Sequence, residues 1–285
     1  MKRIICLLLA LILMLPILAA AEDEEELDIE ETIDGESEED AAETGEAVWD
    51  FPVALEDMKP DFVILANKHY LLEEGFYVKP LVKVRKLKLN KDGSVRTEGV
   101  RWAVGSQMKL QEDCYKALVA MSDAAREDGY NLYLKSAYRS WRTQNTMYKN
   151  RLKKNHGKDD GWVSKAGASD HQTGLGADVI PKSWIKAAGM NSKMAKEPEC
   201  QWMAEHCSEY GFIIRYPEDK EEVTEINYEP WHVRYVGIPV ATYIMENGLC
   251  LEEFTGQLQQ AIEDYLAAGG DRKKVEAFIQ KPDEE

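Results

Sequence analysis

The sequence predicts an α+β fold with a largely antiparallel sheet flanked by helices. Short stretches typical of strands alternate with longer amphipathic stretches typical of helices, without the regular spacing of βαβ units. About 240 residues lie downstream of the N-terminal region, enough for one compact domain of moderate size or a core with appendages. No internal repeat is evident in the sequence.

Period-two alternation and turn residues predict the strands. LVKVRKLKLN (81–90) alternates apolar and basic residues, and KDG (91–93) supplies a turn before VRTEGVRWAV, which together predict a β-hairpin. NLYLKSAYRS is expected to be a strand that runs into a loop. Further strands are expected at 177–180, 212–216 and 231–236.

Helical spacing of apolar residues predicts the remaining elements. In 112–129, apolar residues recur at helical intervals, and Gly129 is a suitable C-terminal cap. Polar or amphipathic helices are also expected at about 141–155, at 195–210, at 240–248 and through the C-terminal segment around 257–270.

The N-terminus has the pattern of a secretory signal peptide, predicted at residues 1–21. Lys2 and Arg3 precede an apolar run that ends at Leu18, and three alanines follow. This run is shorter than the ~20 residues that a spanning helix needs. We therefore expect a secreted, extracytoplasmic protein. The alternative is an uncleaved N-terminal membrane anchor.

An acidic tether is predicted at residues 22–47. Its first 25 residues hold 15 acidic residues and no Lys or Arg, so the segment is expected to be disordered and self-repelling. Without it and the signal segment, 37 acidic and 33 basic residues remain, a formal charge of about −4 against −17 for the whole chain. The folded part is near neutral, which implies neither a nucleic-acid-binding surface nor a basic patch for binding membranes.

Four cysteines remain after the signal segment. Export would permit disulfides, but Cys200 and Cys207 lie on one predicted helix, about 10 Å apart at 1.5 Å per residue. That separation exceeds the disulfide limit of about 7 Å, and the sequence has no CxxC metal pattern. We expect buried free thiols.

A candidate metal site combines two segments. ASDHQTGLGADVI (168–180) contains His171 and Asp178, and EINYEPWHVRYV contains His232. Two imidazoles and a carboxylate suit a catalytic zinc site, which uses three protein ligands and leaves a position for water. Taken singly, each has an ordinary alternative, since Asp178 could form a turn and His232 could be a packed core residue.

Glu229 lies three residues before His232 and is a candidate general base. Residues three apart on a regular strand face opposite sides, so we expect Glu229 in the turn made by Pro230 and His232 on the strand itself. A solvated loop acid is the alternative. Arg139, in SAYRSWRTQ, could be a surface charge, but its planar fork suits a terminal carboxylate.

Four ordered motifs carry a resemblance to a known family. AYRSWRTQ, SDHQTGLGAD, YGFIIRYP and EPWHVRYV resemble the VanY-type zinc D-alanyl-D-alanine carboxypeptidases of the Hedgehog/LAS-like metallopeptidases. The resemblance spans roughly residues 62–251, including the lead-in ILANKHYLL (64–72). It implies a catalytic domain at 48–251 with that fold, and it leaves 252–285 as a helical extension.

The resemblance also implies roles for individual residues. One Zn²⁺ would bind His171, Asp178 and His232, with Glu229 as catalytic base and Arg139 on the substrate carboxylate. Ser169 and Gln144 match positions that line the substrate site. The chain departs from the family pattern at Ala166-Gly167, where relatives often have Pro-Gly, and at Asp170, where they often have Glu.

The expected function is an exported, cell-wall-associated zinc carboxypeptidase that removes terminal D-alanine from peptidoglycan stem peptides. An L,D-carboxypeptidase, a D,D-dipeptidase or a peptidoglycan endopeptidase could use the same metal site. A non-catalytic wall-binding module with a structural metal is the alternative from another class. Glu229 argues against that module, because a structural site has no use for an unligated base.

Overall fold

The structure, a computed structural model, describes residues 47–283, which belong to one compact unit. The predicted signal peptide (1–21) and nearly all of the predicted acidic tether (22–47) lie outside the described residues. Within the described range, no helix combines the length and the apolar character needed to cross a membrane.

A five-stranded sheet forms the centre of the fold. Its strands are β4 (Arg101–Trp102), β6 (Leu132–Ser136), β7 (Gly176–Pro181), β9 (His232–Tyr235) and β8 (Phe212–Ile214), in that spatial order. Only the β4–β6 pair is parallel; the other three pairs are antiparallel. This arrangement confirms the predicted α+β class and the largely antiparallel sheet.

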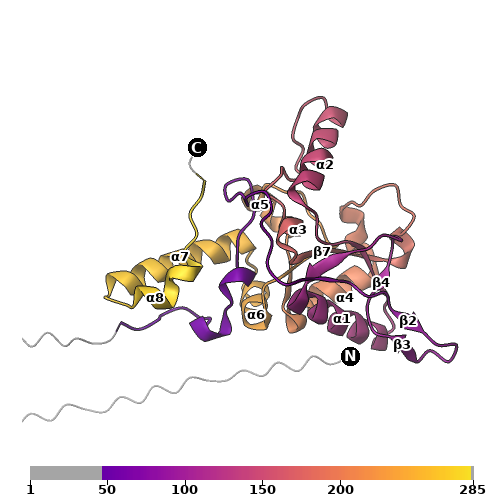
Figure 1. The fold of residues 1–285 in the computed structure, drawn as a ribbon, viewed down its shortest axis with the longest axis horizontal. Coiled ribbons are helices and arrows are strands. Elements are labelled where there is room, and N and C mark those ends of the chain that lie inside the picture. The colour runs from indigo at the N-terminus through magenta and orange to yellow at the C-terminus, as the bar shows by residue number, and fades with distance from the viewer. Residues whose placement is uncertain (1–46, 284–285) are drawn as a thin grey trace, which may run out of the picture. The chain divides into compact units, whose positions relative to one another are not determined.

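Helices cover the sheet and extend the unit at one end (Figure 1). The chain contains α1 (Glu112–Glu127), α2 (Trp141–Lys154), α3 (Asp170–Thr173), α4 (Pro198–His206), α5 (Glu221–Thr224), α6 (Ile238–Glu246), α7 (Leu251–Ala267) and α8 (Arg272–Val275). The helices at 112–129, 141–155 and 240–248 were predicted within a few residues of these bounds. Gly129 has φ +90°, as expected of a residue that ends a helix.

The predicted hairpin at 81–104 is only partly correct. β2 (Lys88–Leu89) and β3 (Val95–Thr97) do pair across the predicted turn. However, β1 (Leu81–Lys83) pairs with β5 (Lys109–Gln111), a distant strand. Val84 is buried just after β1, and its backbone N–H donates to Met108. Burial against the core therefore overrides continuation of the local hairpin.

The predicted helix at 195–210 is also only partly correct, because it is divided near its start and ends in a tighter turn. A 3₁₀ turn ends at Lys196, α4 begins at Pro198, and a second 3₁₀ turn covers Cys207–Tyr210. Pro198 occupies the first turn of α4, where a missing N–H costs little, but the residue before a proline disfavours helical backbone. Glu197 accordingly has extended backbone.

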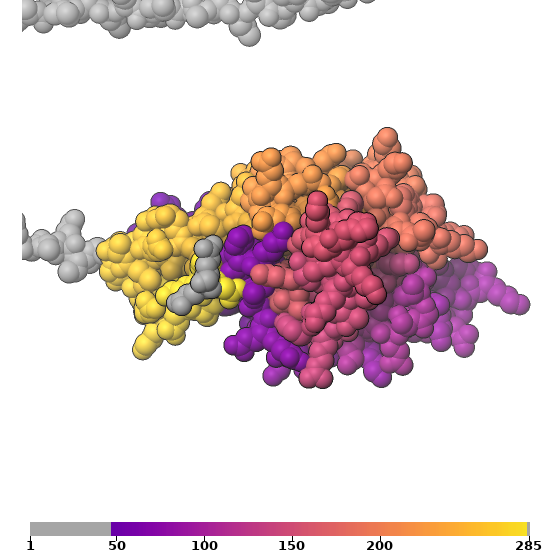
Figure 2. Space-filling view, turned by 90° about the horizontal axis from the view of Figure 1, so that it is seen from above, coloured from indigo at the N-terminus to yellow at the C-terminus, as the bar shows by residue number. Residues whose placement is uncertain are grey.

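Two hydrophobic clusters stabilise the fold. One packs around the central sheet, α1 and α4. The other joins α6 and α7 to the lead-in segment near Val53 and Val63, and Figure 2 shows the C-terminal helices beside that lead-in. The four cysteines of the described chain are free and buried, as predicted.

Candidate functional site

Adjacent strands place Asp178 and His232 side by side. The two residues are register partners in the antiparallel pair β7–β9, and Asp178 also pairs with Ser136 of β6. Directly opposed residues of an antiparallel pair project to the same face of the sheet. The central sheet thus holds an acid and an imidazole on rigid backbone.

A single helical turn delivers His171 to the same place. α3 ends at Gly174, which has left-handed backbone with φ +81°, a conformation that glycine adopts without cost. Gly176 lets the chain double back, because a Cβ there would lie 3.1 Å from the backbone of Asp170. The two glycines therefore fold the loop tightly enough for both of its ends to face one point.

The three predicted ligands converge. His171 Nε2 lies 3.3 Å from Asp178 Oδ1, and His232 Nδ1 lies 3.0 Å from the same oxygen. All three ligand atoms are within 4.8 Å of one another, and all three residues are buried. His171 Nδ1 donates to the carbonyl of Ala137 at 2.7 Å, which fixes the tautomer and leaves the lone pair of Nε2 facing Asp178.

Burial tunes the charges of these groups. It lowers the pKa of His171 to about 4, aided by the nearby Arg139, so the imidazole is neutral at pH 7 and able to ligate. Burial alone would raise the pKa of Asp178, but the adjacent histidines outweigh it and hold that pKa well below the usual value. A neutral imidazole beside an ionised carboxylate is the donor set that divalent metals bind.

Glu229 lies beside the three ligands without joining them. Its Oε2 is 3.7 Å from His232 Nδ1, and its carbonyl accepts from the N–H of His232 at 3.1 Å, so it lies in the turn before β9, as expected. Burial, and then the charge of Asp178, raise the pKa of Glu229 well above its ordinary value. A carboxylate with raised proton affinity next to a candidate metal site is suited to proton transfer.

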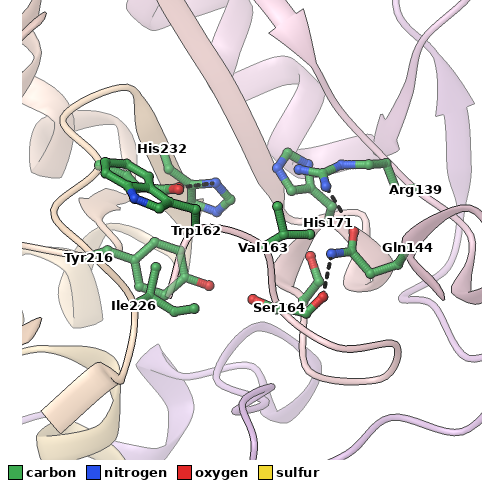
Figure 3. A pocket seen from close by; sticks show the side chains of 11 residues that line it. Arg139, Gln144, Trp162, Val163, Ser164, His171, Tyr216, Ile226 and His232 are labelled. Atoms are coloured by element: carbon green, nitrogen blue, oxygen red, sulfur yellow. Dashed lines mark hydrogen bonds and ion pairs between the residues drawn. The ribbon is translucent and has the colours of Figure 1, made fainter. Parts of the chain in front are cut away.

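Arg139 reaches the site from the loop after β6 (Figure 3). Its Nη2 lies 3.6 Å from Asp178 Oδ2, and its Nη1 donates to Gln144 Oε1 at 2.8 Å. Gln144, 1% exposed on α2, donates in turn to the carbonyl of Ser164 at 2.8 Å. Gln144 therefore orients the guanidinium, and Ser169 lines the same cavity.

The cavity has further walls that the sequence analysis did not assign to it. Its volume is about 30 Å³, room for at least one water molecule. Trp162 stacks on Trp231 with ring centroids 6.3 Å apart, and the ring centroids of Tyr216 and His232 lie 5.1 Å apart. The motif YGFIIRYP signalled Tyr216, whereas Trp162 stands outside every motif. The unassigned lining residues are Trp162, Val163, Ser164, Tyr216 and Ile226.

Comparison with known proteins places this geometry in a family. A family model described as VanY, D-alanyl-D-alanine carboxypeptidase, matches residues 107–238. The bifunctional D-Ala-D-Ala dipeptidase and carboxypeptidase VanXYC of Enterococcus gallinarum is 34% identical over 136 residues, which cover 47% of this chain and 72% of that protein. The chain belongs to the VanY family.

Other relatives agree with this membership. A D-alanyl-D-alanine carboxypeptidase of Enterococcus faecalis is 38% identical over 142 residues, covering 46% of this chain and 50% of that protein. The LdcB LD-carboxypeptidase, a solved structure described with peptidoglycan recognition, superposes with a TM-score of 0.59 at 32% identity, covering 70% of this chain and 87% of that one. This VanY-family chain spans about half the length of several curated relatives.

Proposed function

We propose that this protein is an exported zinc carboxypeptidase that removes the terminal D-alanine from peptidoglycan stem peptides. The observation that carries the proposal is the convergence of His171, Asp178 and His232 on one buried point. Glu229 and Arg139 line the same cavity in a chain of the VanY family. A metal, a base and a carboxylate clamp are the three parts that such a hydrolysis requires.

The residues present fit a zinc ion. Tetrahedral zinc with nitrogen and oxygen ligands at ~2.0 Å places neighbouring ligand atoms about 3.3 Å apart, close to the 3.3 Å and 3.0 Å that separate the two imidazole nitrogens from Asp178 Oδ1. The Nε2 atom of His171 is buried without a hydrogen-bond partner, as expected of a ligand atom. His171, Asp178 and His232 would hold the ion.

Arg139 is the residue that would select the end of a chain. Its guanidinium is held by Gln144 on one side and faces Asp178 and the cavity on the other. A planar fork with two parallel donors binds a terminal carboxylate in one orientation. Holding that carboxylate places the last peptide bond beside Glu229.

Glu229 would carry the proton. A bound zinc ion polarises the scissile carbonyl and lowers the pKa of water to ~7. Glu229 would then accept the proton of the attacking water as the new C–O bond forms. When the C–N bond breaks, Glu229 would return that proton to the amine nitrogen of the leaving alanine. The products are a shortened peptide carboxylate and free alanine.

A product assay with defined stem peptides tests the proposal. The purified protein, loaded with zinc, is incubated with tetrapeptide and pentapeptide stems, and the products are identified by mass. Release of one D-alanine from the pentapeptide is the expected result. If neither stem loses alanine, the proposed activity is wrong.

L,D-carboxypeptidase activity on tetrapeptide stems is the second candidate. The likeness to the LdcB LD-carboxypeptidase, with a TM-score of 0.59, favours it specifically. Both activities use the same clamp and metal site and differ in the residue that precedes the scissile bond. Release of alanine from the tetrapeptide alone would select this second activity.

The place of action is part of the same proposal. The N-terminal signal pattern supports export, and stem peptides are found outside the cytoplasm. If the N-terminal segment is not cleaved, it would hold the enzyme at the membrane surface. Fractionation of cells that produce the full chain, with mass measurement of the released form, tests both statements.

A further inference from the structure

A buried charge cluster lies directly behind the metal triad. It comprises Asp170 on α3, Arg215 after β8, Arg234 on β9 and Glu252 on α7. The side chains of Asp170, Arg215 and Arg234 are fully buried, and that of Glu252 is 10% exposed. Burying a charged side chain is costly unless the charge is paired, so the partners of each charge in this cluster indicate its role.

The pairing divides the oxygens of Asp170 between different partners. Oδ1 accepts from Arg234 Nη1 at 2.5 Å. Oδ2 lies 2.7 Å from Arg215 Nε, but the two atoms are not aligned for a hydrogen bond, and neither has another hydrogen-bond partner. Oδ2 therefore keeps an acceptor site inside the protein.

His232 presents the group that this acceptor lacks. Its Nδ1 faces Asp178 at 3.0 Å, while its Nε2 is buried without a hydrogen-bond partner, 4.0 Å from Asp170 Oδ2. An imidazole that ligates through Nδ1 carries its proton on Nε2. Closing the 4.0 Å gap to hydrogen-bond distance needs a shift of about 1 Å.

Glu252 keeps Asp170 available for that role. Its two oxygens accept from both terminal nitrogens of Arg215, at 2.8 Å and 2.7 Å. The two terminal nitrogens of Arg215 are thus held by Glu252, and only its Nε faces Asp170 Oδ2. Without Glu252, the terminal nitrogens of Arg215 would lose their acceptor, Asp170 would be the anion left beside the guanidinium, and bidentate pairing would occupy Oδ2.

We propose that Asp170 is a positioning residue that accepts the Nε2 proton of His232 and so fixes Nδ1 as the metal-binding atom, and that Glu252 on α7 enables this by neutralising Arg215. The inference rests on the proposed metal site. It assigns the C-terminal helix, which lies outside the family segment 107–238, a part in building that site. Carboxylates behind metal-bound histidines contribute 10–100-fold to metal affinity.

Zinc affinity measured against a chromophoric chelator tests the proposal on the whole protein, independently of turnover. Asp170→Asn and Glu252→Gln are each expected to weaken zinc binding about tenfold or more. Asp170→Glu keeps a carboxylate and is expected to stay within about threefold of the parent protein. Glu253→Gln is the matched control, because Glu253 is also a first-turn acid of α7 in an ion pair, with Lys220 at 3.0 Å, and it does not contact Asp170.

Nitrogen-15 NMR of the histidines in the zinc-loaded protein supplies a readout that general destabilisation does not move. The parent protein and Asp170→Glu are expected to show a His232 Nε2 proton with the downfield chemical shift of a hydrogen-bonded imidazole, and Glu252→Gln a smaller downfield shift. Zinc affinities of Asp170→Asn and Glu252→Gln within threefold of the parent would overturn the proposal, as would an equal loss in Glu253→Gln. If Asp170→Asn does not fold, Glu252→Gln and Asp170→Glu still decide the question.

The same samples separate this inference from the proposed function. If the parent protein binds zinc and the variants follow the expected order, but no stem peptide loses alanine, the positioning role stands and the proposed activity fails. If alanine is released and the variants bind zinc like the parent, the activity stands and the positioning role fails.

Discussion

Replacement of Glu229 by glutamine separates turnover from metal binding. Glutamine keeps the shape of the side chain but cannot accept a proton. General bases contribute about 10²–10⁴-fold, which corresponds to about 3–5 kcal/mol at 1.36 kcal/mol per tenfold. Because Glu229 Oε2 lies 3.7 Å from His232 Nδ1 and Glu229 is not among the three converging ligands, zinc affinity is expected to stay within a few fold.

Stability gives an independent reading of the same variant. Burial and the charge of Asp178 raise the pKa of Glu229, so the ionised side chain opposes folding of the metal-free protein, and Glu229→Gln is expected to unfold at the same or a higher urea concentration. Glu225→Gln is a suitable control, because Glu225 is exposed and pairs with His69 at 3.0 Å. Turnover of Glu229→Gln within tenfold of the parent would refute the general-base role, and loss of zinc would show that Glu229 is a ligand.

Three further predictions concern the clamp, the first imidazole and the loop. Arg139→Lys removes the planar guanidinium that donates to Gln144 at 2.8 Å. Loss of a charged hydrogen bond costs about 1.5–3 kcal/mol, so KM in steady-state assays should rise about 10–100-fold, with little change in zinc affinity. An unchanged KM would exclude Arg139 as the carboxylate clamp. Burial lowers the pKa of His171 from 6.5 to about 4, so the unfolded chain binds the proton more readily than the folded one. The free energy of unfolding of the metal-free protein should therefore fall by up to about 3 kcal/mol as the pH drops from 6.5 to 4. Urea unfolding across this range measures the fall, and the same pH dependence in His171→Gln would show that His171 is not its source. Gly176→Ala places a Cβ 3.1 Å from the backbone of Asp170 and should cost about 1–3 kcal/mol and weaken zinc binding; unfolding and zinc titrations that match the parent would show that the loop can relax.

The sequence predicted which residues converge at the candidate metal site better than it predicted their surroundings. His171, Asp178 and His232 lie in compact motifs, and the strands that carry two of them have clear apolar patterns. In these places local sequence and tertiary structure agree, so local reasoning succeeds.

Other features depend on contacts that no local pattern encodes. The β1–β5 pairing joins two segments across the intervening strands β2, β3 and β4, and it is accompanied by burial of Val84. Glu252 meets Arg215 across 37 positions, and its place on α7 looks in sequence like an ordinary charged first turn. Gln144 was expected to line the substrate site, and only the fold shows that it holds Arg139.

The reactivity of the buried thiols can report local opening of the folded protein. Burial raises the pKa of Cys200 and of Cys207 to about 12, so an alkylating reagent at neutral pH meets almost no thiolate until the surrounding segment opens. Cys114 lies on α1, Cys200 on α4 and Cys250 at the start of α7. Alkylation followed by peptide mass would therefore time the opening of three separate helices in one experiment. Addition of zinc should slow the reaction of Cys250 if α7 and the metal site open together.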